Sequence, residues 1–136
     1  MVTSSLSTLV IPANVQVFND ASDEFLVVVD NGKIERVFSN LIKNACDAML
    51  NGGQLKITSR KSNGQVEVAF SDSGEGMSKE VLQKLWTPFF TTKPKGLGIG
   101  LGICKRIVEA HMGRIKVEST LGKGTVFTVF LPLENS

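Results

Sequence analysis

The sequence predicts an α+β fold, a two-layer sandwich in which helices cover one face of a mixed, mostly antiparallel sheet. Two stretches, residues 33–50 and about 99–112, carry apolar residues at three- and four-residue spacing, as amphipathic helices do. Several shorter stretches alternate apolar and polar residues, and some flank turn signals that are typical of hairpins. Hairpins interleaved with two long helices favour a sheet with its helices on one face.

The first elements are a loose start and two strands. Residues 1–5 read as a loose start, or residues 1–11 as a helix remnant, and any short helix must end before Pro12. Alternation over residues 15–18 and a β-branched run at 25–29 predict strands. The helix predicted at 33–50 follows a turn at Asp30-Asn31-Gly32 and stops at Asn51-Gly52-Gly53.

The later elements are two strand pairs and two helices. Residues 55–59 and 66–70 predict a hairpin around Asn63-Gly64. Ser78 is placed to cap a short helix over residues 79–85. Gly113 closes the second long helix, and residues 115–118 and 126–131 predict the last strand pair.

Composition limits the class of protein. A chain of 136 residues fits a single domain, and 42% apolar with 21% charged residues excludes disorder. A net charge of +2 argues against a nucleic-acid-binding domain, and the apolar runs are too short to span a membrane. Cys46 and Cys104 stand alone, which indicates a reduced, cytoplasmic compartment.

Asn40 and Asn44 are the first candidate site residues. They lie four residues apart, on one face of the predicted 33–50 helix and beside its apolar stripe. Their amide oxygens suit a hard cation such as Mg²⁺, whose other ligands are often waters and phosphates. The alternative is an ordinary polar helix surface.

Asp72, Gly74 and Gly76 form a second candidate, directly after the strand predicted at 66–70. A carboxylate at a strand end can accept a hydrogen bond from an exocyclic amine, and the glycines would let a flat ring approach the backbone. Asp-Ser-Gly is equally suited to a plain turn.

Four alternating glycines precede the second long helix: Gly96, Gly98, Gly100 and Gly102. A glycine loop that leads into a helix N-terminus presents free N–H groups to a phosphate. The spacing is neither that of a dinucleotide-binding loop nor that of a Walker loop. A flexible hinge is the alternative. Lys93 and Lys95 follow an aromatic segment that begins at Trp86, and either lysine could reach a terminal phosphate.

In this order, the four motifs resemble the ATP-binding catalytic domain of sensor histidine kinases. Its Bergerat-type nucleotide fold is shared with gyrase, the Hsp90 chaperones and the mismatch-repair protein MutL. The resemblance extends from about residue 30 to 132 and includes the closing segment Gly-Lys-Gly-Thr-Val-Phe. Asn-Ala-Cys-Asp-Ala-Met, together with Thr-Pro-Phe-Phe-Thr-Thr-Lys, is similar to the nitrogen-regulation branch.

The resemblance implies ATP and Mg²⁺ as cofactors and gives each motif a role. Asn44 matches a Mg²⁺ ligand, Asn40 lines the phosphates, and Asp72 matches the aspartate that reads the adenine amino group. Residues 77–95 match a mobile lid. The remaining expected binding residues are Gly74, Gly76, Lys93, Lys95, Gly96, Gly98, Gly100 and Thr125.

Two departures and one histidine limit the expected activity. Relatives that hydrolyse ATP carry Glu where this chain has Asn40, and an amide cannot act as a general base, so fast hydrolysis is not expected. Asp47 stands where many sensor kinases have a lysine, so a phosphate contact is not expected there. His111 matches a helix end and not a phosphoacceptor, so the chain alone should not autophosphorylate.

The resemblance therefore implies a kinase domain that donates the γ-phosphoryl group of ATP to a histidine. That histidine would lie on a dimerisation domain absent from this chain, and a response regulator would be the further partner. We expect a monomeric single domain over residues 1–136, without contact to nucleic acid or membrane. A serine kinase of the anti-sigma type and a nucleotide-sensing module of the same fold remain alternatives.

Overall fold

The computed structural model describes residues 11–21, 31–86 and 100–133, together with Val2, Leu6 and Leu9. The strand predicted at residues 25–29 lies outside this part of the chain, as does most of the short helix before Pro12. The elements are β1 (Val15–Asp20), α2 (Asn31–Asp47), β2 (Gly53–Ser62), β3 (Gln65–Asp72), α3 (Lys79–Lys84), α4 (Gly100–Ala110), β4 (Arg114–Thr120) and β5 (Gly124–Pro132).

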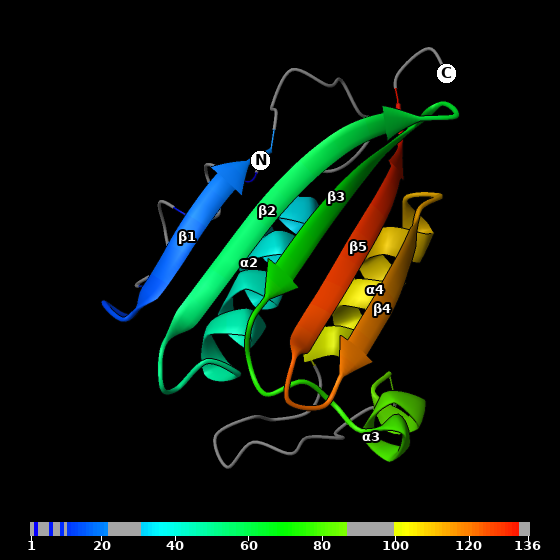
Figure 1. Ribbon diagram of the computed structural model, residues 1–136. Helices are drawn as coiled ribbons and strands as arrows, with labels where there is room; N and C mark the ends of the chain where they lie inside the picture. Colours follow the sequence, from blue (N-terminus) through cyan, green and yellow to red (C-terminus); the bar gives the residue numbers. More distant parts are fainter. Residues whose placement is uncertain are drawn as a thin grey trace.

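The described strands form one sheet in the order β1-β2-β3-β5-β4. β1 runs parallel to β2, and the other neighbours are antiparallel. Figure 1 shows α2 and α4 side by side on the same face of the sheet. The predicted α+β sandwich, with a mixed and mostly antiparallel sheet covered on one face, is confirmed.

The core lies between the two helices and the sheet. The stripe that predicted α2 is buried, and the Phe38 ring lies 5.4 Å from the Phe70 ring of β3, centroid to centroid. Cys104 and Val108 bring α4 into the same cluster. Burial of the inner residues therefore fixes which face of each strand points toward the helices.

Local signals account for most element boundaries. Asn63 and Gly64 both have positive φ, 50° and 77°, as a two-residue hairpin turn requires. Ser78 caps α3 by accepting a hydrogen bond from the Val81 amide. α2 ends at Asp47, three residues before the predicted end, because the chain turns there to bring Gly53 into the ladder opposite Val15. None of the helices among the described residues has the length and apolar character needed to cross a lipid bilayer.

Candidate functional site

Three polar side chains line up across the inner face of the sheet, at the end of β3 that lies toward α3 in Figure 1. Asp72 is opposite Thr125 of β5, and Thr125 is opposite Ser119 of β4. Asp72 and Thr125 are only 7% and 5% exposed. We call Asp72, Thr125 and Ser119 the polar row. Buried polar groups lower stability unless they are hydrogen-bonded, so such a row is a candidate for function.

The segment after Asp72 is held by contacts within the chain. Oδ1 of Asp72 accepts a hydrogen bond of 2.8 Å from the Gly74 amide, and the Glu75 amide donates to the Ala48 carbonyl at the end of α2. A Cβ on Gly74 would lie 2.6 Å from that carbonyl, and one on Gly76 would lie 2.1 Å from the Thr120 carbonyl. The sequence predicts that these glycines admit a flat ring, and this stays a prediction. The structure adds that the protein's own backbone also needs the space at both positions.

Ser119 is a member of the polar row that sequence reasoning missed. Its Oγ accepts a 2.8 Å hydrogen bond from the Met77 amide, lies 2.8 Å from Oγ1 of Thr125 and donates to the Gly124 carbonyl at 3.0 Å. The available signal was the alternation along β4, in which Ile115 and Val117 face the core and the next inward position is a serine. Ser119 thus links Thr125 to the start of the predicted lid.

Residues along α2 contact both the segment after Asp72 and α4. Nδ2 of Asn40 lies 3.6 Å from Sγ of Cys104, so the amide nitrogen, and not the oxygen, faces the sulfur. Asn44 lies one turn further along α2 and is half-buried, and Ala48 lies one turn beyond it, against the segment after Asp72. From Asn40 to Ala48 the chain advances about 12 Å along the helix. Asn40, Asn44 and Ala48 therefore lie along one line of α2, and Ala48 contacts the segment after Asp72.

The two cysteines are unreactive by environment. Burial raises the pKa of the Cys46 thiol, and the negative charges of Asp47 and Asp72 raise it further. Burial also raises the pKa of Cys104, although the hydrogen bond from Asn40 acts in the opposite direction. Thiols react as thiolates, so neither residue is a candidate nucleophile.

The first part of the predicted lid packs against the core. Leu85 is buried, and the Trp86 ring stands edge-on to Phe127 at 6.2 Å and 78°. The ammonium group of Lys105 lies 5.6 Å from the Trp86 ring centroid. The fluorescence of Trp86 would therefore report this contact as well as any lid movement. Lys93, Lys95, Gly96 and Gly98 lie outside the described residues, and Gly100 is the first residue of α4.

His111 has a local structural role. Its Nδ1 lies 2.7 Å from the Ile107 carbonyl oxygen, so that nitrogen carries a proton and donates it to the last turn of α4. This contact agrees with the prediction that His111 marks a helix end.

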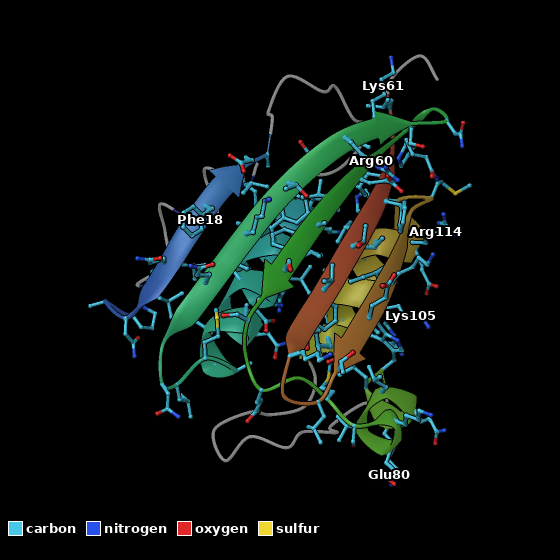
Figure 2. All side chains as sticks on the ribbon, viewed as in Figure 1. Phe18, Arg60, Lys61, Glu80, Lys105 and Arg114 are labelled. Carbon is cyan, nitrogen blue, oxygen red and sulfur yellow. The ribbon has the colours of Figure 1, made fainter. Side chains whose placement is uncertain are left out.

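A hollow of 340 Å³ lies on the helix-free face of the sheet, where Arg60, which Figure 2 labels, pairs with Glu67. It is on the opposite face from the polar row and from both asparagines. In the described part of the chain, no three His, Cys, Asp or Glu side chains are grouped so as to hold a metal ion. A cation at this site would have to rely on amide and ligand oxygens.

The fold is an α+β sandwich in which a buried carboxylate ends β3 and a glycine begins α4, at the same end of the sheet. The sequence profile of the family described as histidine kinase-, DNA gyrase B- and HSP90-like ATPase matches residues 29–135. The catalytic domain of histidine kinase ThkA is 37% identical, with a TM-score of 0.77 over 88% of this chain and 79% of that one. The chain belongs to this family and is an ATP-binding catalytic domain of the histidine kinase type.

Other relatives agree. Sporulation kinase C of Bacillus subtilis is 39% identical in an alignment 136 positions long that covers 98% of this chain and 32% of that protein. Sensor histidine kinase ZraS of Escherichia coli K12 is 38% identical over 115 residues, 85% of this chain and 24% of that protein. The chain thus spans about a third or less of these kinases. Mycobacterial sensor histidine kinase MprB, at 22% identity, shares the fold with a TM-score of 0.86 over 98% of this chain and 92% of that one.

Proposed function

We propose that this chain binds Mg·ATP and donates the γ-phosphoryl group to a histidine on a separate dimerisation domain of a sensor kinase. The observation that carries the proposal is the alignment of Asn40, Asn44 and Ala48 along α2, with Ala48 in contact with the segment that follows the buried Asp72. A response regulator would receive the group from that histidine, as the kinship to whole sensor kinases supports.

The base end of the site would be the polar row. Asp72 is held by the Gly74 amide, so its carboxylate is fixed in orientation before a base arrives. A fixed carboxylate accepts a hydrogen bond from the exocyclic amine of adenine, and guanine offers a carbonyl oxygen there. Rejection of the wrong base is strong in such a site because the buried acceptor is left unpaired. Thr125 would support the same end.

The phosphate end would be formed by the two asparagines and the start of α4. Amide oxygens fit a hard cation, and Asn44 is the residue that would hold Mg²⁺, with Asn40 beside the phosphates. The metal, when bound, supplies charge neutralisation between the phosphate oxygens. The backbone N–H groups at the N-terminus of α4, which begins at Gly100, would stabilise phosphate charge. Gly96, Gly98, Lys93 and Lys95 would complete this end.

The chemistry of the residues indicates which part of the reaction this chain would perform and which part the partner domain would perform. Phosphoryl transfer depends mainly on positioning and charge stabilisation. Asn40 cannot remove a proton from water, so this chain would hold ATP without hydrolysing it quickly and would leave the nucleophile to the partner domain.

Calorimetry with Mg·ATP and with adenosine tests the proposal. We expect Asn44→Ala to weaken Mg·ATP binding by about tenfold, the scale of one lost charge-assisted contact, and to leave adenosine binding unchanged. Asn51→Ala, at an exposed asparagine beyond α2, is the control and should change neither. Equal losses for both ligands would overturn the Mg²⁺ assignment.

A second assay tests the chemistry. Mixed with the histidine-bearing dimerisation domain of a sensor kinase and labelled ATP, the chain should transfer acid-labile label to that domain. Acid-stable label on serine would support the serine kinase instead, and ATP binding without any transfer would favour a nucleotide-sensing module. Rapid ATP hydrolysis by the chain alone would contradict the kinase proposal.

A further inference from the structure

Ser119 has no part in the proposed function so far, yet its hydroxyl is the centre of the polar row. It is half-buried on the inner face of β4, at a position where the two preceding inward residues are apolar. Three groups meet at its Oγ: the Met77 amide, the Gly124 carbonyl and the Thr125 hydroxyl, all between 2.8 and 3.0 Å.

The chemistry of these three partners fixes the direction of each hydrogen bond. A hydroxyl has one proton to donate and two lone pairs that accept. The Gly124 carbonyl can only accept, so it takes the proton of Ser119, and the Met77 amide can only donate, so it occupies one lone pair. The remaining lone pair of Ser119 must therefore accept the proton of Thr125.

Thr125 is thereby left with lone pairs alone for any other partner. It stands directly opposite Asp72, and cross-strand neighbours on one face have Cβ atoms about 5 Å apart. The carboxylate of Asp72 is also an acceptor. The inner face of the sheet end therefore presents two adjacent hydrogen-bond acceptors and no side-chain donor from Thr125.

We propose that Ser119 determines base specificity by fixing Thr125 as a hydrogen-bond acceptor, so that the polar row selects a base edge that carries an amino group. Ser119 acts through Thr125 and is a positioning residue. The inference rests on the proposed function, because it concerns the base end of the same site. The inference goes beyond the proposed function in one respect. Ser119, which decides whether the Thr125 hydroxyl donates or accepts, is on β4 and outside the motifs that predicted the site.

The same hydroxyl ties the row to the loop beside it. Ser119 holds the Met77 amide, and the Gly122 amide donates to the Glu75 carbonyl at 2.7 Å, so the β4–β5 turn and residues 75–77 are joined twice. Loss of the Ser119 hydroxyl would release the Thr125 proton without breaking the second link. The change in polarity can therefore be tested with the loop still attached.

The test compares ATP with inosine triphosphate, in which a carbonyl oxygen replaces the amino group and the adjacent ring nitrogen carries a proton. Affinities are measured by calorimetry with Mg²⁺ for the unmodified chain, Ser119→Ala and Ser119→Thr. We expect the unmodified chain to prefer ATP by about tenfold or more and Ser119→Ala to reduce this preference at least about fivefold, since Thr125 can then donate. Ser119→Thr keeps the hydroxyl and should keep the preference. Ser71→Ala, on the outer face of β3, is the control.

Each outcome decides the inference. If Ser119→Ala weakens both nucleotides by the same factor, Ser119 has a structural role only and the inference is wrong. If Ser119→Ala does not fold, the unmodified chain is tested with the purine analogue that has hydrogen in place of the amino group. Binding of this analogue as tight as that of ATP would overturn the inference. If the unmodified chain binds no ATP, the proposed function itself fails, whereas ATP binding with an unchanged preference refutes this inference alone.

Discussion

Two neighbouring rows of side chains cross the inner face of the sheet, and they differ in what they bury. Ile57, Phe70, Phe127 and Val117 form an apolar row, while two residues along each strand Asp72, Thr125 and Ser119 form the polar row. The apolar row packs under the helices, with Phe70 against Phe38. The polar row ends the sheet beside the turns that follow β3 and β4 (Figure 1).

The difference between the two rows shows where this sheet can bury polar side chains. Apolar burial stabilises wherever it occurs, whereas a polar row is tolerated only if every donor and acceptor is paired. Among the described residues, no buried side-chain nitrogen or oxygen lacks a partner. The polar row obtains its partners from loop backbone, namely the amides of Gly74 and Met77 and the carbonyl of Gly124. Such partners are available at this strand end, where the polar row lies, whereas the middle of the sheet is apolar core.

The largest expected effect is the difference in the free energy of unfolding between a substitution in the apolar row and one in the polar row. Phe70→Ala should lower the free energy of unfolding by about 3–5 kcal/mol, because it removes a fully buried ring from a packed core. Asp72→Asn keeps the shape and the oxygen that accepts from Gly74, and should lower it by about 1 kcal/mol at most. Urea unfolding measures both.

Asp72→Asn should have a small effect on stability and a large effect on nucleotide binding. It should change the base preference while the protein stays folded. An equal stability loss in the two variants would mean that the polar row is as structural as the apolar one, and the comparison would no longer mark a site.

The next effect concerns the backbone beside the polar row. Gly76 and Gly122 both have positive φ, 71° and 82°, yet a Cβ on Gly76 would lie 2.1 Å from the Thr120 carbonyl and one on Gly122 would meet nothing within 4 Å. Gly122→Ala should therefore cost only the left-handed conformation, about 1–2 kcal/mol. Gly76→Ala should cost about 1–3 kcal/mol more, because backbone must shift.

Urea unfolding of the two variants measures the cost of the contact between a Cβ at position 76 and the Thr120 carbonyl. The cost of a positive φ is common to both variants and cancels in the comparison. Amide chemical shifts of Met77 and Thr125 should change in Gly76→Ala more than in Gly122→Ala. Equal costs would indicate that the turn relaxes freely and that the segment after Asp72 is not held as closely as its contacts suggest.

Much of the fold could be predicted because its signals are local. The stripe of α2, the Asn-Gly hairpin turn and the Ser78 cap each depend on residues within one element. Asp72 was likewise predicted as a candidate because it lies at the end of an alternating strand, whereas Thr125 was expected only from the resemblance to the kinase family. The sequence did not reveal that they face each other, which depends on the register of β3 and β5.

The rest depends on contacts between distant segments. The parallel pairing of β1 with β2 joins strands on either side of α2, and the contact between Asn40 and Cys104 spans 64 positions. The role of Ser119 depends on the β4–β5 register, and the need for glycine at position 76 comes from the Thr120 carbonyl. No pattern within one element carries this information, so these residues become visible only when the sheet is assembled.

The smallest expected effect compares the two buried thiols. Cys46 lies within the electrostatic reach of the polar row, whereas Cys104 is raised in pKa by burial alone and has no carboxylate among its causes. Removing the charge of Asp72 should therefore lower the pKa of Cys46 and leave that of Cys104 unchanged. The Cβ resonances of ¹³C-labelled cysteine, followed against pH in the unmodified chain and in Asp72→Asn, report both thiols in one sample.

The same shifts fix the sign of the pH dependence of stability. Both folded thiols have a pKa above the unfolded value of about 8.5, so the folded state keeps its protons while the unfolded state loses them. Their stabilising contribution is complete below that pH and is lost as pH rises through the folded values. The free energy of unfolding should thus decline in alkaline solution, and less steeply in Cys46→Ala. Asp72→Asn lowers the folded pKa of Cys46, so the Cys46 part of this decline should end at a lower pH and be smaller. If Asp72→Asn shifts both thiols equally, the charge acts through a general change of structure, and the proximity of Cys46 to the polar row is refuted.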